Sequence, residues 1–222
     1  MNIEYNIQKI VENLPAGCRL VVVTKTQSPE RILEAYNAGQ RVFGENKVQE
    51  LSEKYAMLPK DIEWHMIGHL QRNKVKHIAP FVDLIHSVDS DRLLEEIDKQ
   101  GARFSRIIPC LLQVYIAEEE TKFGFDADEV RALLQSPEMA DRRHVEIRGL
   151  MGMATFTNDE EKVRNEFRNL RRLFDELKTI SLPENVRLTE LSMGMSNDYL
   201  IAVAEGSTLI RVGTAIFGER MT

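Results

Sequence analysis

The sequence predicts one α/β domain, a (β/α)8 TIM barrel with an extra helix at its N-terminus. The 222 residues suit a barrel near the lower end of its usual size. Hydrophobic residues make up 43% and charged residues 29%, as in ordinary globular proteins. Eight short apolar runs rich in β-branched residues alternate with amphipathic segments. That alternation indicates a parallel sheet, and eight such units close into a barrel.

The elements follow one another in a regular order. Ser28 and Pro29 mark the start of the first helix after a strand, and Gly39 marks its end. A helix beginning at residue 91 is expected to end before Gly101. We expect strands at residues 20–24, 41–45, 62–67, 83–88, 108–116, 146–151, 187–191 and 209–212. We expect helices at about 28–38, 71–78, 91–99, 127–134, 159–178 and 197–205, and one that follows the second strand and ends at about 55. An extra helix at about 3–14 is expected against the barrel's bottom or side.

A doubly wound open sheet is the alternative arrangement of the same elements. Its dinucleotide-binding form is disfavoured because no glycine-rich fingerprint follows the first strand. No linker, repeat or low-complexity stretch interrupts the chain. We therefore expect residues 1–222 to form a single domain.

Charge and cysteine content exclude several classes of function. The net charge of −6 argues against nucleic-acid binding, and Arg168, Arg171 and Arg172 alternate with acidic residues as on a solvated helix face. Cys18 and Cys110 form no CxxC pair and fit a reducing compartment. The sequence shows no signal peptide and no apolar run long enough to span a bilayer. We expect a soluble cytoplasmic protein without a membrane partner.

Lys25 is the first candidate functional residue. It comes one residue after the first strand, at the barrel end where active sites lie. Partial desolvation there would lower the pKa of its amine and free it to attack an aldehyde. The plain alternative is a lysine that begins a solvent-exposed loop.

Two glycine-containing segments follow the last two strands, at residues 191–197 and 211–215. Gly194 and Gly213 permit close approach of the backbone, while Ser196 and Thr214 supply hydroxyls. Barrels often bind phosphate at these two positions. Ordinary turn chemistry is the alternative for either segment alone, but the two together favour a phosphate site.

Side chains alternate between the two faces of a strand, so Arg211 shares a face with Leu209, two residues earlier in the last strand. Arg211 is therefore expected to point into the barrel. A buried guanidinium needs a partner, either a buried carboxylate or an acceptor on a ligand. No metal site is expected, since His65 and His69 lie on a strand and its loop and match no HExxH pattern. Trp64 is expected in the core.

Seven motifs carry a resemblance to a known family. They are VVTKT at 22–26, FGENKVQE at 43–50, WHMIGHLQ at 64–71, HSVD at 86–89, GLMGM at 149–153, LSMGMS at 191–196 and RVGTAIFG at 211–218. In this order they resemble the YggS/PROSC family of pyridoxal phosphate homeostasis proteins, which is related to the N-terminal domain of alanine racemase. The resemblance runs from about residue 4 to the end of the chain.

The resemblance implies fold-type III binding of pyridoxal 5′-phosphate (PLP), with Lys25 as the Schiff-base lysine. It places Arg211 opposite the pyridine nitrogen. Met66 and His69 depart from the family's usual residues and affect only the local pocket wall. The phosphate would be held by Ser196, Gly213, Thr214 and main-chain amides around Met195, and the pocket would be lined by Asn46, His86 and Met153.

The resemblance further implies a protein that stores, buffers or delivers PLP, with PLP-dependent apo-enzymes as possible recipients. Alanine racemase has a second domain and a partner tyrosine, whereas this chain ends at Thr222, so we expect no strong catalysis and favour a monomer over a dimer. A weak racemase is the alternative, with Tyr115, His65 or His86 as the second base. A phosphosugar barrel that uses Lys25 as an aldolase-type amine is a third hypothesis.

Overall fold

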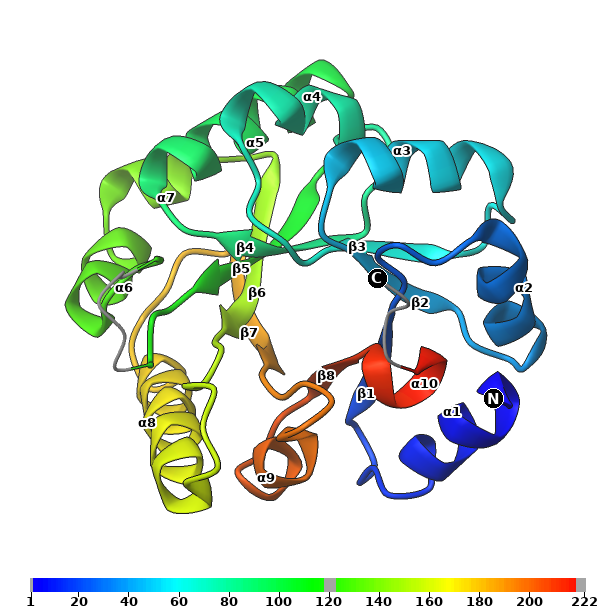
Figure 1. Ribbon diagram of the computed structural model, residues 1–222. Coiled ribbons are helices and arrows are strands. Elements are labelled where there is room, and N and C mark those ends of the chain that lie inside the picture. The colour runs from blue at the N-terminus through cyan, green and yellow to red at the C-terminus, as the bar shows by residue number, and fades with distance from the viewer. Residues whose placement is uncertain (1, 118–122, 219–222) are drawn as a thin grey trace.

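Eight parallel strands form a closed barrel in the order of the sequence (Figure 1). The structure is a computed structural model, which describes residues 2–117 and 123–218. The strands are β1 (Arg19–Val23), β2 (Val42–Glu45), β3 (Glu63–Met66), β4 (Leu84–Val88), β5 (Ile108–Gln113), β6 (Val145–Met151), β7 (Val186–Ser192) and β8 (Leu209–Val212).

Strand β1 closes the barrel. Val22 is in register with Phe43 of β2 on one side and with Val212 of β8 on the other. The sheet therefore has no edge between its first and last strands. This confirms the predicted barrel, and the doubly wound open sheet is wrong.

The helices surround the barrel (Figure 1). The N-terminal helix α1 packs against α2 and α10, and Asn6 Nδ2 donates a hydrogen bond to the Ile216 carbonyl at 3.0 Å. The extra N-terminal helix is thus confirmed, at the side of the barrel. The helices are α1 (Ile3–Val11), α2 (Pro29–Asn37), α3 (Val48–Met57), α4 (Val75–Ile78), α5 (Asp91–Arg103), α6 (Ala127–Leu134), α7 (Pro137–Asp141), α8 (Glu160–Leu177), α9 (Tyr199–Ala204) and α10 (Thr214–Phe217), with a 3-10 turn at Arg72–Lys74.

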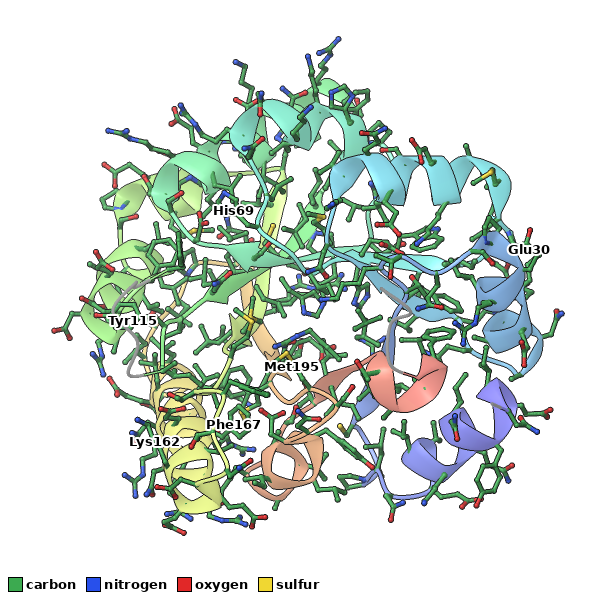
Figure 2. All side chains as sticks on the ribbon, viewed as in Figure 1. Glu30, His69, Tyr115, Lys162, Phe167 and Met195 are labelled. Carbon is green, nitrogen blue, oxygen red and sulfur yellow. The ribbon has the colours of Figure 1, made fainter. Side chains whose placement is uncertain are left out.

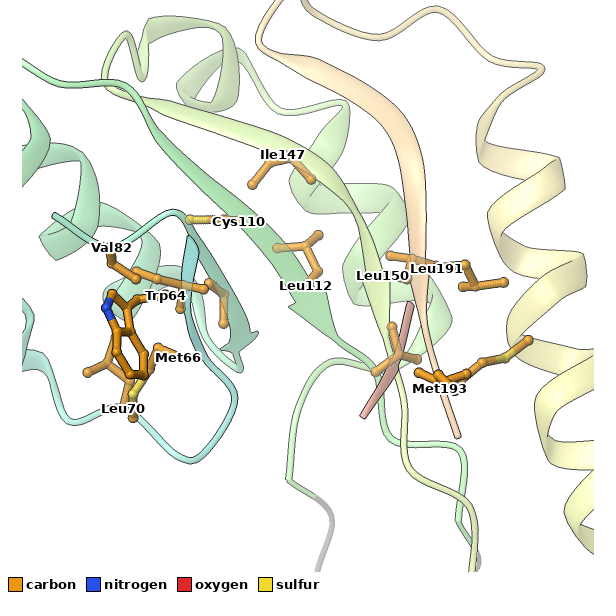
Figure 3. Packing of buried hydrophobic residues seen from close by; sticks show 14 of the residues in the cluster. Trp64, Met66, Leu70, Val82, Cys110, Leu112, Ile147, Leu150, Leu191 and Met193 are labelled. Atoms are coloured by element: carbon orange, nitrogen blue, oxygen red, sulfur yellow. The ribbon is translucent and has the colours of Figure 1, made fainter. Parts of the chain in front are cut away.

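The two faces of each strand serve two layers of the core. The outward face packs on the helices, as Figure 3 shows for Trp64 and Met66 of β3 and for Leu191 of β7. Trp64 is fully buried, as predicted. A smaller layer fills the barrel and consists of Val21, Val42, Leu84, Leu111, Met151 and Leu209, with Ile67 packed against it. The candidate site lies directly above this inner layer, at the C-terminal ends of the strands.

Three sequence-based boundaries are wrong. Strand β5 ends at Gln113, because Val114 leaves the sheet to form a single bridge with Phe125. The expected helix at 71–78 is a 3-10 turn followed by the short α4, and α7 was not expected. Helix α5 continues through Gly101 to Arg103. A Cβ at Gly101 would lie 2.6 Å from the His144 carbonyl oxygen, so this glycine permits close packing instead of ending the helix.

The surface matches the charge pattern of the sequence. Arg168 pairs with Glu205 and Arg171 with Asp175, so these two arginines of α8 belong to mixed-charge ion pairs. Among the described helices, none combines the length and apolar character needed to cross a membrane.

Candidate functional site

A cavity of about 760 Å³ opens at the C-terminal ends of the barrel strands. Its wall includes residues that directly follow β1, β2, β3, β6, β7 and β8. This is the end at which TIM barrels carry their active sites. The position of the cavity follows from the topology, because parallel strands deliver all their carboxyl ends to one face.

Lys25 reaches this cavity through the alternation of β1. Val21 belongs to the inner layer, and Val23 and Lys25 both line the cavity above it. Thr24 points the opposite way and is fully buried. Lys25 is half-buried, so its side chain is partly desolvated. This agrees with the expectation from the sequence and not with a lysine in an open loop.

Arg211 points into the barrel, as predicted, and is 4% exposed. It donates hydrogen bonds to Ser192 Oγ and, at 3.2 Å, to the Gly152 carbonyl. Burial lowers the pKa of its guanidinium to about 10, against the opposing effect of the Asp198 carboxylate. Arg211 is therefore a cation at neutral pH, and its hydrogen bonds to described residues go to neutral oxygens.

A column of hydrogen bonds continues from Arg211 into the barrel. Ser192 Oγ lies 2.8 Å from His86 Nδ1, and His86 Nε2 lies 2.9 Å from His65 Nδ1. Burial lowers the pKa of His65 to about 3 and that of His86 well below its ordinary value. Both rings are therefore neutral. Neutral rings satisfy these contacts with the hydrogen bonds running in either direction along the column, and in both cases Ser192 Oγ accepts from Arg211.

The segments after β7 and β8 meet at the cavity. Ser196 Oγ accepts from the amides of Gly213 and Ala215, at 3.4 Å each. The left-handed φ of +96° at Gly194 favours glycine, and a Cβ there would lie 2.6 Å from Ala202 Cβ. The Met195 amide donates to Asp198 Oδ1. The predicted phosphate segments are thus adjacent, but a carboxylate of the same loop engages one of the amides.

Nearly all predicted site residues share this cavity. His86 is the exception, because it is fully buried and reaches the cavity only through Ser192 and Arg211. Figure 2 shows Met195 toward the middle of the barrel and Tyr115 at its edge beside α6. The predicted residues that line the cavity are Lys25, Asn46, Met153, Met195, Ser196, Arg211, Gly213 and Thr214.

Sequence reasoning missed three parts of the site. Ser192 carries the contact between Arg211 and His86, and its only signal was its place in the LSMGMS motif. Asp198 shapes the loop after β7. The segment after β6 adds Thr155 and other residues to the wall, and Glu166 of α8 holds the Thr155 amide and hydroxyl at 2.7 Å each. Their roles depend on tertiary contacts.

The donor set fits an anionic ligand that carries an aldehyde. Lys25 supplies an amine, Arg211 a fixed cation, and Ser196 and Thr214 hydroxyls next to backbone amides. Asn46 Oδ1 is buried and has no hydrogen-bond partner among the described residues, which indicates that a bound ligand supplies a donor to it. Within residues 2–117 and 123–218, no cluster of histidine, cysteine and acidic side chains could hold a metal ion.

Comparison with known proteins agrees with this architecture. The family model "Alanine racemase, N-terminal domain" matches residues 1–221. The chain and alanine racemase from Bartonella henselae share the fold, with a TM-score of 0.73 at 16% identity over all of this chain and 61% of that one. Fold and site therefore define a protein with the alanine racemase N-terminal domain.

Closer relatives narrow the class. The pyridoxal phosphate homeostasis protein of Aquifex aeolicus is 42% identical over 96% of this chain and 93% of its own length. PipY of Synechococcus elongatus, whose structure has been determined with PLP bound, is 40% identical, with a TM-score of 0.88 over 97% of this chain and all of PipY. The chain belongs to the pyridoxal phosphate homeostasis protein family.

Proposed function

We propose that this protein binds PLP as a Schiff base on Lys25 and acts in intracellular PLP homeostasis by storing, buffering or delivering the cofactor. The observation that carries the proposal is one cavity that holds a half-buried lysine, a buried arginine and the paired segments after β7 and β8. An aldehyde, a ring nitrogen and a phosphate would satisfy these three features, and PLP contains all of them. The PLP-bound structure of PipY supports the proposal.

Each residue of the site has a defined task in this proposal. The Lys25 amine would condense with the aldehyde, forming a C=N bond and releasing one water. Arg211 would donate to the pyridine nitrogen, and Ser196, Gly213 and Thr214 would hold the phosphate. Asn46 and Met153 would line the ring's pocket, while His86 would support Arg211 through Ser192.

Arg211 also favours a binding role over strong catalysis. PLP supplies an electron sink for carbanion chemistry, and that sink is strongest when the ring nitrogen is protonated. An arginine is a hydrogen-bond donor only, so it cannot accept a hydrogen bond from a protonated ring nitrogen. It therefore favours the neutral ring.

The described wall of the cavity offers no histidine or tyrosine. The candidate second bases His65 and His86 are buried and bonded to each other, and Tyr115 is not part of the described wall. These observations support a homeostasis protein over the alternative of a weak racemase. Racemisation of a common amino acid that is lost in Lys25→Ala would contradict this part of the proposal.

The remaining parts of the proposal concern the setting of the protein. We expect one domain over residues 1–222, a monomer with a dimer as the alternative, and PLP-dependent apo-enzymes as recipients. Cys18 and Cys110 are free thiols, which supports a cytoplasmic location. Sedimentation of the full chain at several concentrations tests the oligomeric state.

The first experiment is the visible absorption spectrum of the PLP-treated protein before and after borohydride reduction. Lys25→Ala removes the proposed Schiff-base lysine, and Lys76→Ala, an exposed lysine on α4, is the matched control. We expect a Schiff-base band in the wild type and in Lys76→Ala that shifts on reduction, with complete loss in Lys25→Ala. A wild type that stays colourless with added PLP would overturn the proposal and favour the phosphosugar barrel.

A further inference from the structure

We propose that Glu50 and Lys54 of α3, together with Glu45 of β2, are positioning residues that fix the backbone of Lys25 and so aim its amine into the cavity. This inference rests on the proposed PLP function. The cluster of Thr24, Glu45, Glu50 and Lys54, called here the Lys54 cluster, lies outside the cavity wall. Its members would therefore act through Lys25 and not by touching the ligand.

Lys54 is the centre of the cluster. Its side chain is 5% exposed although it lies on a surface helix. Its ammonium lies 2.6 Å from Glu45 Oε1, 2.6 Å from Glu50 Oε1 and 2.7 Å from the Thr24 carbonyl oxygen. An ammonium has three N–H donors, so these contacts use all of them. Lys54 thereby joins helix α3 to the ends of β1 and β2.

The cluster holds the peptide groups on both sides of Lys25. The peptide before it is held by Lys54 through the Thr24 carbonyl, and the Thr24 hydroxyl also donates to Glu45 at 2.5 Å. The peptide after it is held by Glu50, whose Oε1 accepts the Thr26 amide at 2.6 Å. With both flanking peptides held, the two backbone dihedrals of Lys25 are restrained. The direction of its Cβ is then set by α3.

The backbone conformation at Thr26 explains why such restraint is needed. Thr26 has φ of +66°, in the left-handed region that a β-branched residue rarely adopts. The chain turns sharply there, directly after Lys25. A residue held in this region costs about 1–3 kcal/mol, and it persists when its surroundings impose it. The charge-assisted hydrogen bond from the Thr26 amide to Glu50 supplies that restraint.

Burial of these charges argues for a role beyond simple stability. Glu45 is fully buried, and its Oε2 has no hydrogen-bond partner among the described residues. Buried ion pairs are often replaceable by apolar side chains at little loss, so they are a poor device for stability alone. An ammonium that binds the backbone next to Lys25 gives a direction that an apolar side chain could not give.

The test compares three variants of α3. Glu50→Ala removes the acceptor of the Thr26 amide, and Glu50→Gln keeps an oxygen there. Glu53→Ala removes an exposed carboxylate that accepts a hydrogen bond from Gln49 at 3.0 Å. PLP is titrated into each protein, and we measure the Schiff-base absorbance, the visible circular dichroism per bound PLP and the thermal midpoint. The dichroism reports how rigidly the ring is held, which a loss of stability alone would leave unchanged.

We expect Glu50→Ala to weaken PLP binding about tenfold, as for a lost charge-assisted hydrogen bond, and to reduce the dichroism per bound PLP. Glu50→Gln should recover most of both signals, and Glu53→Ala should match the wild type. Thr24→Val, which removes only the hydroxyl bonded to Glu45, should show the same trend with less disturbance of charge.

The outcomes separate this inference from the proposed function. A wild type without a Schiff-base band would refute the PLP function itself. If the wild type binds PLP but Glu50→Ala and Thr24→Val keep its affinity and dichroism, the positioning role is wrong. A lower thermal midpoint alone, with unchanged dichroism, would also contradict it.

Discussion

Two buried polar clusters flank the cavity and differ in how they hold a cation. The Lys54 cluster lies between the barrel and α3, pairs its cation with the carboxylates of Glu45 and Glu50, and holds the backbone on either side of Lys25. The second cluster, called the His86 column, lies inside the barrel and comprises Arg211, Ser192, His86 and His65. It holds the side chain of Arg211 with neutral groups.

This difference shows how each cluster can fail. Loss of a charge from the Lys54 cluster leaves an opposite charge buried, which is costly. Loss of a neutral member of the His86 column leaves only an unsatisfied donor or acceptor, which costs less. A change in the Lys54 cluster should alter where Lys25 points, and a change in the His86 column should alter the surroundings of the pyridine nitrogen of bound PLP.

Lys54→Met should give the largest effect. It leaves Glu45 and Glu50 without their cation, and breaking a buried pair typically costs about 3–5 kcal/mol. The measurement is denaturant unfolding at neutral pH. Burial already raises the pKa of Glu45, so Glu45→Leu added to Lys54→Met should recover much of the loss. A double variant as unstable as Lys54→Met would show that the loss does not come from the unpaired carboxylate.

The pH dependence of unfolding should reveal the His86 column. The folded pKa of His65 is about 3, below its ordinary value of 6.5. Below pH 6.5 the unfolded chain therefore binds protons that the folded chain refuses, and stability falls as the pH falls. For His65 this loss is about 2 kcal/mol at pH 5. It should continue toward pH 3, and His86 adds a loss of the same sign.

The slope of stability against pH, measured by unfolding between pH 8 and pH 5, checks this prediction. His65→Asn should have a shallower slope than the wild type, because only His86 remains. His77→Asn, which changes an exposed histidine on α4, controls for the loss of a histidine as such. Equal slopes in all three proteins would show that His65 is not held neutral.

Ser192→Ala should give the smallest loss of stability. It removes one of the two acceptors of Arg211 and the link to His86, at a cost of about 1–3 kcal/mol. We expect PLP still to be trapped on Lys25 by borohydride, with a shifted absorption maximum because Arg211 is held only by its contact with the Gly152 carbonyl among the described residues. Ser207→Ala, another buried hydroxyl bonded to backbone carbonyls, tests whether loss of any buried serine shifts the band. A shift in both variants would argue against a specific role for the column.

Local patterns predicted the barrel and the main site residues. The position of Lys25 just after β1 placed it at the active-site end of the barrel, alternation along β8 placed Arg211 on the inner face, and the loops after β7 and β8 followed from strand order. The family resemblance implied that His86 lines the pocket, but a motif position carries no information on depth. His86 therefore supports the cavity from beneath instead of lining it.

The remaining features depend on contacts between distant segments. Lys54 is an ordinary helical lysine in the sequence, and only the packing of α3 on the barrel makes it a buried partner of Thr24. Gly101 resembles a glycine that ends a helix, but a glycine is needed there because the backbone of His144, many residues away, packs against it. A single sequence without structure offers no local signal for either contact.

The pairing of β1 with β8 has a consequence for the synthesis of this protein. Val22 lies in register with Val212, so strands far apart in the chain must meet before the barrel closes. Lys25 leaves the ribosome long before Arg211 does, and such non-local pairing forms slowly. A nascent chain therefore exposes Lys25 with no pocket around it, and the cavity that surrounds this residue forms only once translation has passed the last strand.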